Sequence, residues 1–179
     1  MTGLVAMGVI NVLSCIVLAL LTVQRLSELV IANRNTKRLM AQGAVETGAD
    51  HYVFIVALHA AWLVGLWVLG WDRPINLILL GVFVLLQAGR VWVLATLGPR
   101  WTTRIITLPG APLVTRGPFR FVSHPNYVVV ALEIAVLPLA FGLVWYAVAF
   151  TVLNAAMMWV RIRSEAGALS EASREGLAP

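Results

Sequence analysis

Long apolar runs separated by short polar stretches form the main pattern of this chain. Residues 4–23, 52–70 and 75–97 are three such runs, and each has about the 20 residues that a transmembrane helix needs. A fourth run, residues 127–160, is long enough for two helices that are slightly shorter than usual. The pattern therefore predicts a protein that crosses a membrane several times.

The fourth run carries turn signals near its middle. Pro138 and the pair Phe141-Gly142 stand where a tight turn between two helices is expected. We therefore predict an all-α integral membrane protein with about five transmembrane helices, of which the last two form a hairpin.

The basic residues support this count. The positive-inside rule puts the loops that are rich in Lys and Arg in the cytoplasm, so we expect the N-terminus outside and the C-terminus inside, in a bacterial inner membrane. A four-helix count would put the basic tail outside, which fits worse. Eleven of the 13 basic residues fall on the predicted cytoplasmic side: Arg25, Arg34, Lys37, Arg38, Arg100, Arg104, Arg116, Arg120, Arg161, Arg163 and Arg174.

The composition excludes several other classes of protein. Hydrophobic residues make up 60% of the 179 residues and charged residues 12%, against about 45–50% and 25% in soluble domains. The net charge of +5 is explained by the loops rather than by nucleic-acid binding. The single cysteine, Cys15, excludes an intrachain disulfide and a cysteine-based metal site. We expect one domain, with a three-helix part (1–97) and a motif-bearing part (98–179) that ends in a polar tail.

Two charged residues interrupt the apolar runs. Glu133 lies in the fourth run and Arg90 in the third, where an ionisable side chain is costly and usually marks a functional site. Two interpretations stay open: the two residues form a structural ion pair, or Arg90 keeps Glu133 ionised so that it acts as a base. Gln87 and Asn154 lie at similar depths and are candidate substrate contacts.

The segment 98–126 is unusually apolar for a loop and is expected to pack against the helix ends. Within it, Ser123-His124-Pro125 is typical of a helix start, and the amide groups there suit a carboxylate or phosphate. Arg120 precedes this start and Tyr127 follows it, so His124 is either a structural residue or part of a catalytic site. Trp101 is a candidate substrate contact.

A second pair of charges lies near the C-terminus. Arg161 and Glu165 are four residues apart and so share one face of a helix. They form either a helix-end ion pair or a ligand contact.

The segments LVTRGPFRFVSHPNY (113–127) and RIRSEAGAL (161–169) resemble the two motifs of the isoprenylcysteine carboxyl methyltransferase family. Ser123 stands where that family usually has Arg, and Ala166 where it has a second Glu. The segments 96–110 and 124–139 are most similar to a bacterial branch of this family. That branch is associated with type III polyketide synthases and O-methylates alkylpyrones or alkylresorcinols.

The resemblance implies S-adenosylmethionine as methyl donor, bound at the cytoplasmic face. Arg120 and His124 would then meet its carboxylate, Glu165 its ammonium or ribose, and Tyr127 its adenine or sulfonium. Backbone groups of Leu113 and Val114 would frame the adenine. The full set of expected cofactor contacts is Leu113, Val114, Gly117, Pro118, Arg120, His124, Pro125, Tyr127, Arg161 and Glu165.

We therefore expect methyl transfer to a hydroxyl or carboxylate of a lipophilic substrate. Glu133 would act as base, with Arg90 and His124 as further catalytic residues, and the substrate would enter from the bilayer between the third and fourth helices. The alternatives are an isoprenylcysteine carboxyl or phospholipid methyltransferase, an NADPH-dependent sterol-type reductase, and a non-enzymatic membrane scaffold. Membrane lipid is an expected partner, nucleic acid is not, and the oligomeric state stays open.

Overall fold

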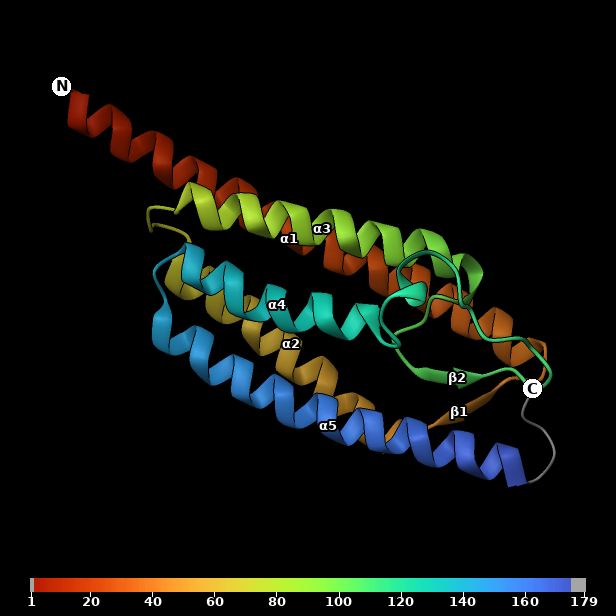
Figure 1. The fold of residues 1–179 in the computed structure, drawn as a ribbon. Helices are drawn as coiled ribbons and strands as arrows, with labels where there is room; N and C mark the ends of the chain where they lie inside the picture. Colours follow the sequence, from red (N-terminus) through yellow and green to blue (C-terminus); the bar gives the residue numbers. More distant parts are fainter. Residues whose placement is uncertain (1, 175–179) are drawn as a thin grey trace.

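A computed structural model describes residues 2–174, with the side chains of residues 12–164 apart from Asp50. Figure 1 shows the order of the elements along the chain. The elements are α1 (Thr2–Ala41), β1 (Val45–Thr47), α2 (Ala49–Gly70), α3 (Leu77–Leu97), the short 3-10 helix η1 (Gly98–Arg100), β2 (Ile105–Thr107), the 3-10 helix η2 (Gly117–Arg120), α4 (Pro125–Ala140) and α5 (Val144–Arg174).

The prediction of an all-α integral membrane protein is confirmed. Within the described residues, α1, α2, α3 and α5 are long and apolar enough to cross a membrane. The fifth helix, α4, is apolar but has only 16 residues, which span ~24 Å of a hydrocarbon core that is ~30 Å thick. Residues 2–174 thus form the expected five α-helices, of which four meet the length of a membrane span.

The first helix differs from its predicted bounds. It continues past residue 23 to Ala41 and has 40 residues, so it is ~60 Å long, about twice the thickness of the hydrocarbon core. No Gly or Pro interrupts residues 9–42, and the helix stops only where Gly43 adopts a positive φ of 86°. Arg25, which was predicted to lie in a loop, is therefore inside this helix, because hydropathy marks the end of an apolar run and not the end of a helix.

The hairpin of the last two helices is confirmed. Helix α4 ends at Ala140 and α5 begins at Val144. Gly142 has a positive φ of 70° in the turn between them, where a residue without a side chain is favoured. The amide of Leu143 donates to the carbonyl of Pro138 and closes the turn. Helix α5 extends into the predicted polar tail as far as Arg174.

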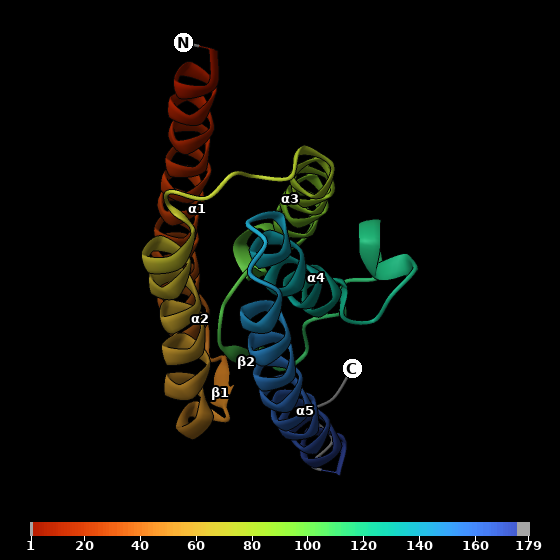
Figure 2. The same cartoon turned by 90° about the vertical axis from the view of Figure 1, so that its left-hand side faces the viewer.

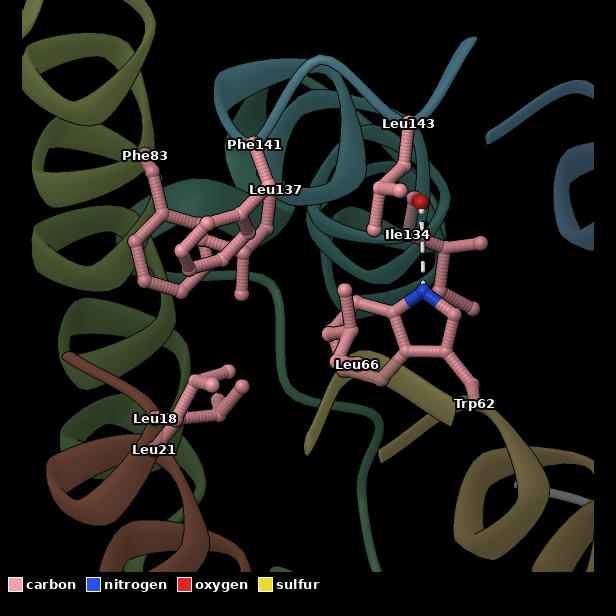
Figure 3. Packing of buried hydrophobic residues seen from close by; sticks show 9 residues of the cluster. All are labelled: Leu18, Leu21, Trp62, Leu66, Phe83, Ile134, Leu137, Phe141 and Leu143. Carbon is pink, nitrogen blue, oxygen red and sulfur yellow. Dashed lines mark hydrogen bonds between the residues drawn. The ribbon is translucent and has the colours of Figure 1, made fainter. Parts of the chain in front are cut away.

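The apolar core lies where α1, α2, α3 and α4 meet. Figure 3 shows its buried side chains, and the indole Nε1 of Trp62 donates to the carbonyl of Ile134 at 3.3 Å within it. Most other apolar side chains of the helices are exposed and suit contact with lipid, as Trp145 does at 84% exposure. The core residues are Leu18, Leu21, Trp62, Leu66, Phe83, Ile134, Leu137, Phe141 and Leu143.

A small sheet lies at one end of the helices. Strands β1 and β2 pair antiparallel, with Val45 opposite Thr107. The pair joins the α1–α2 connection to the segment that follows α3, near the C-terminal end of α5 (Figure 1). Three-residue strands leave no clear hydropathy pattern, and the sequence did not predict them.

Candidate active site

A cavity of about 270 Å³ lies between the helices. Its wall comes from α1, α2, α4 and α5, from Arg90 of α3, and from residues 101–103. The volume is slightly below the ~300–1,000 Å³ that is usual for a small-molecule site. The wall is mostly apolar, and its polar and aromatic members are Arg25, Glu28, Tyr52, His59, Trp62, Arg90, Trp101, Thr102, Thr103, Asn126, Tyr127, Asn154 and Arg161.

A network of buried charges lies beside this cavity. Glu133 is fully buried, and its Oε2 accepts from Arg25 Nη2 at 2.6 Å and from Arg90 Nη1 at 2.9 Å. Its other oxygen, Oε1, accepts from Gln87 Nε2 at 2.8 Å. Both carboxylate oxygens are therefore held by donors, two of them charged, which is how a buried carboxylate is stabilised.

A second carboxylate completes the network. Arg90 donates to both oxygens of Glu28, through Nε and Nη2, at 2.6 Å each. Gln24 Nε2 bridges Glu28 Oε1 at 3.0 Å and Gln87 Oε1 at 2.7 Å. These six residues, which we call the ion network, join α1, α3 and α4 with two positive and two negative charges: Gln24, Arg25, Glu28, Gln87, Arg90 and Glu133.

The ion network bears on the two interpretations of Glu133. The pair of Glu133 with Arg90 is present, and Glu133 is not among the residues that line the cavity, whereas Arg25, Glu28 and Arg90 are. This geometry favours Glu133 as a structural partner that holds the two guanidinium groups. Asn154 lines the cavity, but its amide donates to Met158 Sδ at 3.3 Å rather than to the network.

Two predicted site residues, Tyr127 and Arg161, line the loop end of the cavity, and a third, His124, packs against Tyr127. Arg161 donates from Nε to the hydroxyl of Tyr127 at 2.8 Å and from Nη1 to the carbonyl of Thr103 at 2.9 Å. The ring of His124 stacks on that of Tyr127, with centroids 5.0 Å apart. Within the part of the chain whose side chains are described, Arg161 makes no ion pair with a carboxylate.

The small sheet supports the same end of the cavity. Arg104 of the β2 segment donates to Glu46 of β1 at 2.7 Å and lies 4.4 Å above the ring of Tyr52. The hydroxyls of Tyr52 and Thr103 are hydrogen-bonded at 2.9 Å. The hydrogen bond to Glu46 raises the pKa of Arg104 above its ordinary value, so this guanidinium stays charged.

Polar atoms without a partner gather at this one cavity. Among the described side chains, the buried atoms that lack a hydrogen-bond partner are Arg25 Nε, Trp101 Nε1 and Asn126 Oδ1. All three residues line the cavity. Buried polar groups are nearly always paired, so two donors and one acceptor left at one cavity indicate a polar ligand.

Comparison with known proteins decides the family. The sequence profile of the isoprenylcysteine carboxyl methyltransferase (ICMT) family matches residues 78–171. The chain belongs to the ICMT family. It is also similar to an uncharacterized protein of Bacillus subtilis (strain 168), YpbQ, with 37% identity over 163 residues that cover 88% of this chain and 97% of the relative. No solved structure matches the chain significantly. ICMT proteins are membrane methyltransferases that take their methyl group from S-adenosylmethionine.

The ICMT motif begins in a segment that lies apart from the cavity. Leu113, Val114, Gly117, Pro118 and Arg120 do not line it. The segment projects from the side of α4 that faces away from α1 and α2 (Figure 2). Leu113 is 71% exposed. The path of the backbone keeps these residues away from the cavity. The spacing of a motif along the sequence does not predict that path.

Gly117 has a structural explanation in this segment. Its φ is +61°, and a Cβ at this position would lie 2.6 Å from Thr96 Oγ1 on α3. A residue with a side chain would therefore clash there, and Gly117-Pro118 begins η2 against the end of α3. The cofactor role of this pair stays a prediction.

The second half of the motif forms a helix start, as predicted. Pro125 is the first residue of α4, and His124 occupies the N-cap position, although its side chain does not cap the helix. Helix α4 then carries Asn126 and Tyr127 to the cavity. The side chain of Glu165 lies outside the described residues, so neither interpretation of Glu165, an ion pair with Arg161 or a ligand contact, is tested.

The structure adds residues that the sequence analysis missed. Arg25 and Glu28 follow the first apolar run and were missed because that run was ended too early. His59 lies in the middle of the second run, where an ionisable residue is as informative as Glu133 is in the fourth. Thr103 and Asn126 carry no sequence signal of their own, since only the fold brings them to the cavity.

Proposed function

We propose that this protein transfers a methyl group from S-adenosylmethionine to a hydroxyl, or a carboxylate, of a lipophilic substrate such as an alkylpyrone or alkylresorcinol. The observation that carries the proposal is the mostly apolar cavity at which three buried polar atoms have no partner. A ligand with an apolar body and a few polar atoms matches such a wall.

The residues at the loop end of the cavity fit the methyl donor. Arg161 has no carboxylate partner among the described side chains and suits the carboxylate of S-adenosylmethionine. Asn126 Oδ1, an acceptor, suits the ammonium or a ribose hydroxyl, and Trp101 Nε1 suits an acceptor atom. The ring of Tyr127 lines the cavity and suits the sulfonium cation, and His124, which does not line the cavity, stacks on that ring.

When bound, S-adenosylmethionine supplies an electrophilic methyl group. The chain then has to align the acceptor oxygen with that group, because orientation accounts for much of the rate of such a transfer. Arg25 and Arg90 line the deep end of the cavity and suit an oxygen that gains negative charge. Glu133 and Glu28 hold these two guanidinium groups in place.

The apolar part of the acceptor fits a route between α1 and α2. Leu26 and Leu29 of α1 and Val56 of α2 line the cavity and are nevertheless 58%, 41% and 38% exposed. Side chains that face both the cavity and the lipid suit an alkyl chain that extends into the bilayer. The expected route between the third and fourth helices is not supported, because α3 and α4 make the most extensive contacts of any two elements in the described residues.

We keep the predicted orientation as part of the proposal, with the C-terminus in the cytoplasm of a bacterial inner membrane. The small sheet, the segment after α3 and the C-terminal end of α5 lie at the same end of the helices (Figure 1). That end carries Arg100, Arg104, Arg116 and Arg120, which the positive-inside rule assigns to the cytoplasm.

The deciding experiment is a transfer assay with the full chain in lipid nanodiscs. S-adenosylmethionine labelled at its methyl group is incubated with a panel of alkylpyrones, alkylresorcinols, prenylcysteines and phospholipids. Label in an alkylpyrone or alkylresorcinol supports the proposal in full. Label only in prenylcysteine or phospholipid would support a methyltransferase with a different substrate class. No label in any acceptor would contradict the proposal.

A further inference from the structure

His59 is a titratable residue of the cavity that nothing above explains. It lies in the middle of α2, a helix of 22 residues that is otherwise strongly apolar. Its ring is half-buried and lines the cavity. An ionisable side chain at this depth in a membrane helix usually faces a cavity and marks function.

The hydrogen bond of His59 defines its tautomer. Nδ1 lies 2.8 Å from the carbonyl oxygen of Ile55, one turn earlier in α2. A carbonyl oxygen only accepts, so Nδ1 carries the hydrogen, and in the neutral ring Nε2 then holds a free electron pair. Among the described residues, this is the only hydrogen bond that the ring makes.

The other titratable groups of the wall are already engaged. Both oxygens of Glu28 accept from Arg90. The hydroxyl of Tyr127 accepts from Arg161, and that of Tyr52 is bonded to Thr103. His59 therefore has the available basic atom. The charged and titratable groups that share the wall with it are Arg25, Glu28, Tyr52, Arg90, Tyr127 and Arg161, with Glu133 behind them.

We infer that His59 is the general base for the methyl acceptor, and that the acceptor is a hydroxyl compound that reaches the site with its proton, such as a phenol. This inference rests on the proposed function. The hydroxyl proton passes to Nε2, which becomes N–H of an imidazolium. The electron pair of the oxygen forms the new bond to the methyl carbon, while the bond from that carbon to sulfur breaks and leaves its electrons on sulfur.

The neighbouring guanidinium groups complete this step. Arg25 and Arg90 line the cavity with His59, and Arg25 Nε has no hydrogen-bond partner. A positive donor of this kind stabilises the negative charge that develops on the acceptor oxygen as its proton leaves. An acceptor that is already ionised needs the guanidinium groups but not His59, which separates the two roles experimentally.

The test compares two acceptors in His59→Asn. Asparagine keeps an N–H near the position of Nδ1 and removes the basic Nε2. We expect the rate with an octyl-substituted resorcinol, which is protonated at neutral pH, to fall by ~10²–10⁴-fold. The rate with an octyl-substituted nitrophenol, which is ionised at the pH of the assay, should stay within a factor of about three of the wild type. His51→Asn is the matched control, because His51 belongs to the same helix but does not line the cavity.

Two further measurements exclude a merely structural role. Binding of S-adenosylmethionine should be unchanged in His59→Asn, and the rate of this variant with the resorcinol should rise with pH as the solution ionises the acceptor. Equal losses with both acceptors, or a wild-type rate with both, would overturn the assignment. If His59→Asn does not fold, His59→Gln, which also lacks a basic atom, takes its place.

A measurement without the methyl donor separates this inference from the proposed function. The octyl-substituted nitrophenol is bound to the wild-type protein below the pH at which it ionises in solution. The absorption band of the phenolate should appear with the wild type and with His51→Asn, and be absent with His59→Asn. Equal spectra for all three proteins contradict the role of His59 even if no methyl transfer is ever found. A phenolate band without any transfer contradicts the proposed function alone.

Discussion

The carboxylates of the ion network and the cavity wall beside it differ in whether their buried polar atoms have hydrogen-bond partners. In the network, both oxygens of Glu133 and both oxygens of Glu28 accept hydrogen bonds from Arg, Gln or both. On the wall, Trp101 Nε1 and Asn126 Oδ1 are buried without partners. Carboxylates whose oxygens are all paired contribute to the packing of helices. Unsatisfied atoms, which include Arg25 Nε of the network itself, are stable only when a ligand or water completes them. The contrast distinguishes the two paired carboxylates, which hold the helices together, from the unpaired wall atoms, which suit a ligand; Arg25 and Arg90 belong to both groups of residues.

The network should give the largest effect on stability. Glu133→Leu leaves Arg25 and Arg90 with one carboxylate between them in a buried position. Removal of one partner from a buried ion pair costs about 3–5 kcal/mol, so we expect a much lower unfolding temperature in detergent. Asn154→Leu is the control, because Asn154 is equally buried but donates only to a sulfur atom. An equal fall of the unfolding temperature in the two variants would contradict a special contribution of the ion network to stability.

Substitution of a charged residue of the cavity wall should have the largest effect on ligand binding. Arg161→Met removes the guanidinium that we assign to the carboxylate of S-adenosylmethionine, and a charged hydrogen bond contributes about 1.5–3 kcal/mol, or roughly 10–100-fold in affinity. Arg163→Met is the matched control, since Arg163 lies on the same helix and stacks on the exposed Trp159 at 4.0 Å. Equilibrium binding measures both variants. If Arg161→Met bound S-adenosylmethionine with wild-type affinity, the cofactor carboxylate would not lie at Arg161.

The route between α1 and α2 can be blocked from the lipid side. Val56→Trp fills the cavity edge at a residue that faces both lipid and cavity. If it displaces about two methylene groups of the alkyl chain at ~0.8 kcal/mol each, KM for a long-chain acceptor should rise roughly tenfold. KM for a short-chain analogue should hardly change. Val53→Trp, on the same helix and 67% exposed but outside the cavity wall, should behave as the wild type.

The smallest effect is expected at a single unpartnered donor. Trp101→Phe keeps an aromatic ring in the cluster with Ala32 and Val93 and removes only Nε1. A neutral hydrogen bond to a ligand contributes about 0.5–1.5 kcal/mol, so ligand affinity should fall roughly 2–10-fold. The unfolding temperature without ligand should not fall, because the lost group has no partner in the protein. A clear loss of stability would show that Nε1 serves the fold.

The features of the structure that depend on hydropathy, namely the apolar helices and the charges inside them, were predicted from the sequence. The run 52–70 corresponds to α2 (Ala49–Gly70), and the turn at Gly142 was predicted from Pro138 and Phe141-Gly142 in the middle of the fourth run. Arg90 and Glu133 were found because a charge in an apolar run is conspicuous. The second half of α1 was missed, because the end of an apolar run does not mark the end of a helix, and Arg25 and Glu28 were missed with it.

The site depends more on contacts than on motifs. Tyr127 and Arg161 were predicted from the family motif and meet at the cavity. Leu113 and Arg120 come from the same motif and lie apart from it, since the path of the segment between α3 and α4 is set by packing such as that of Gly117 against Thr96. Asn126 and Thr103 lie at the cavity only because the fold brings them there. No motif or hydropathy pattern in the sequence predicts that position.

Calorimetric titration of the wild-type protein decides whether it binds S-adenosylmethionine. The protein in nanodiscs is titrated with S-adenosylmethionine, with its demethylated product and with NADPH. We expect saturable binding of the first two and none of the third, and weaker binding of S-adenosylmethionine by Arg161→Met than by Arg163→Met. Binding of NADPH alone, or of none of the three, would contradict the proposed function.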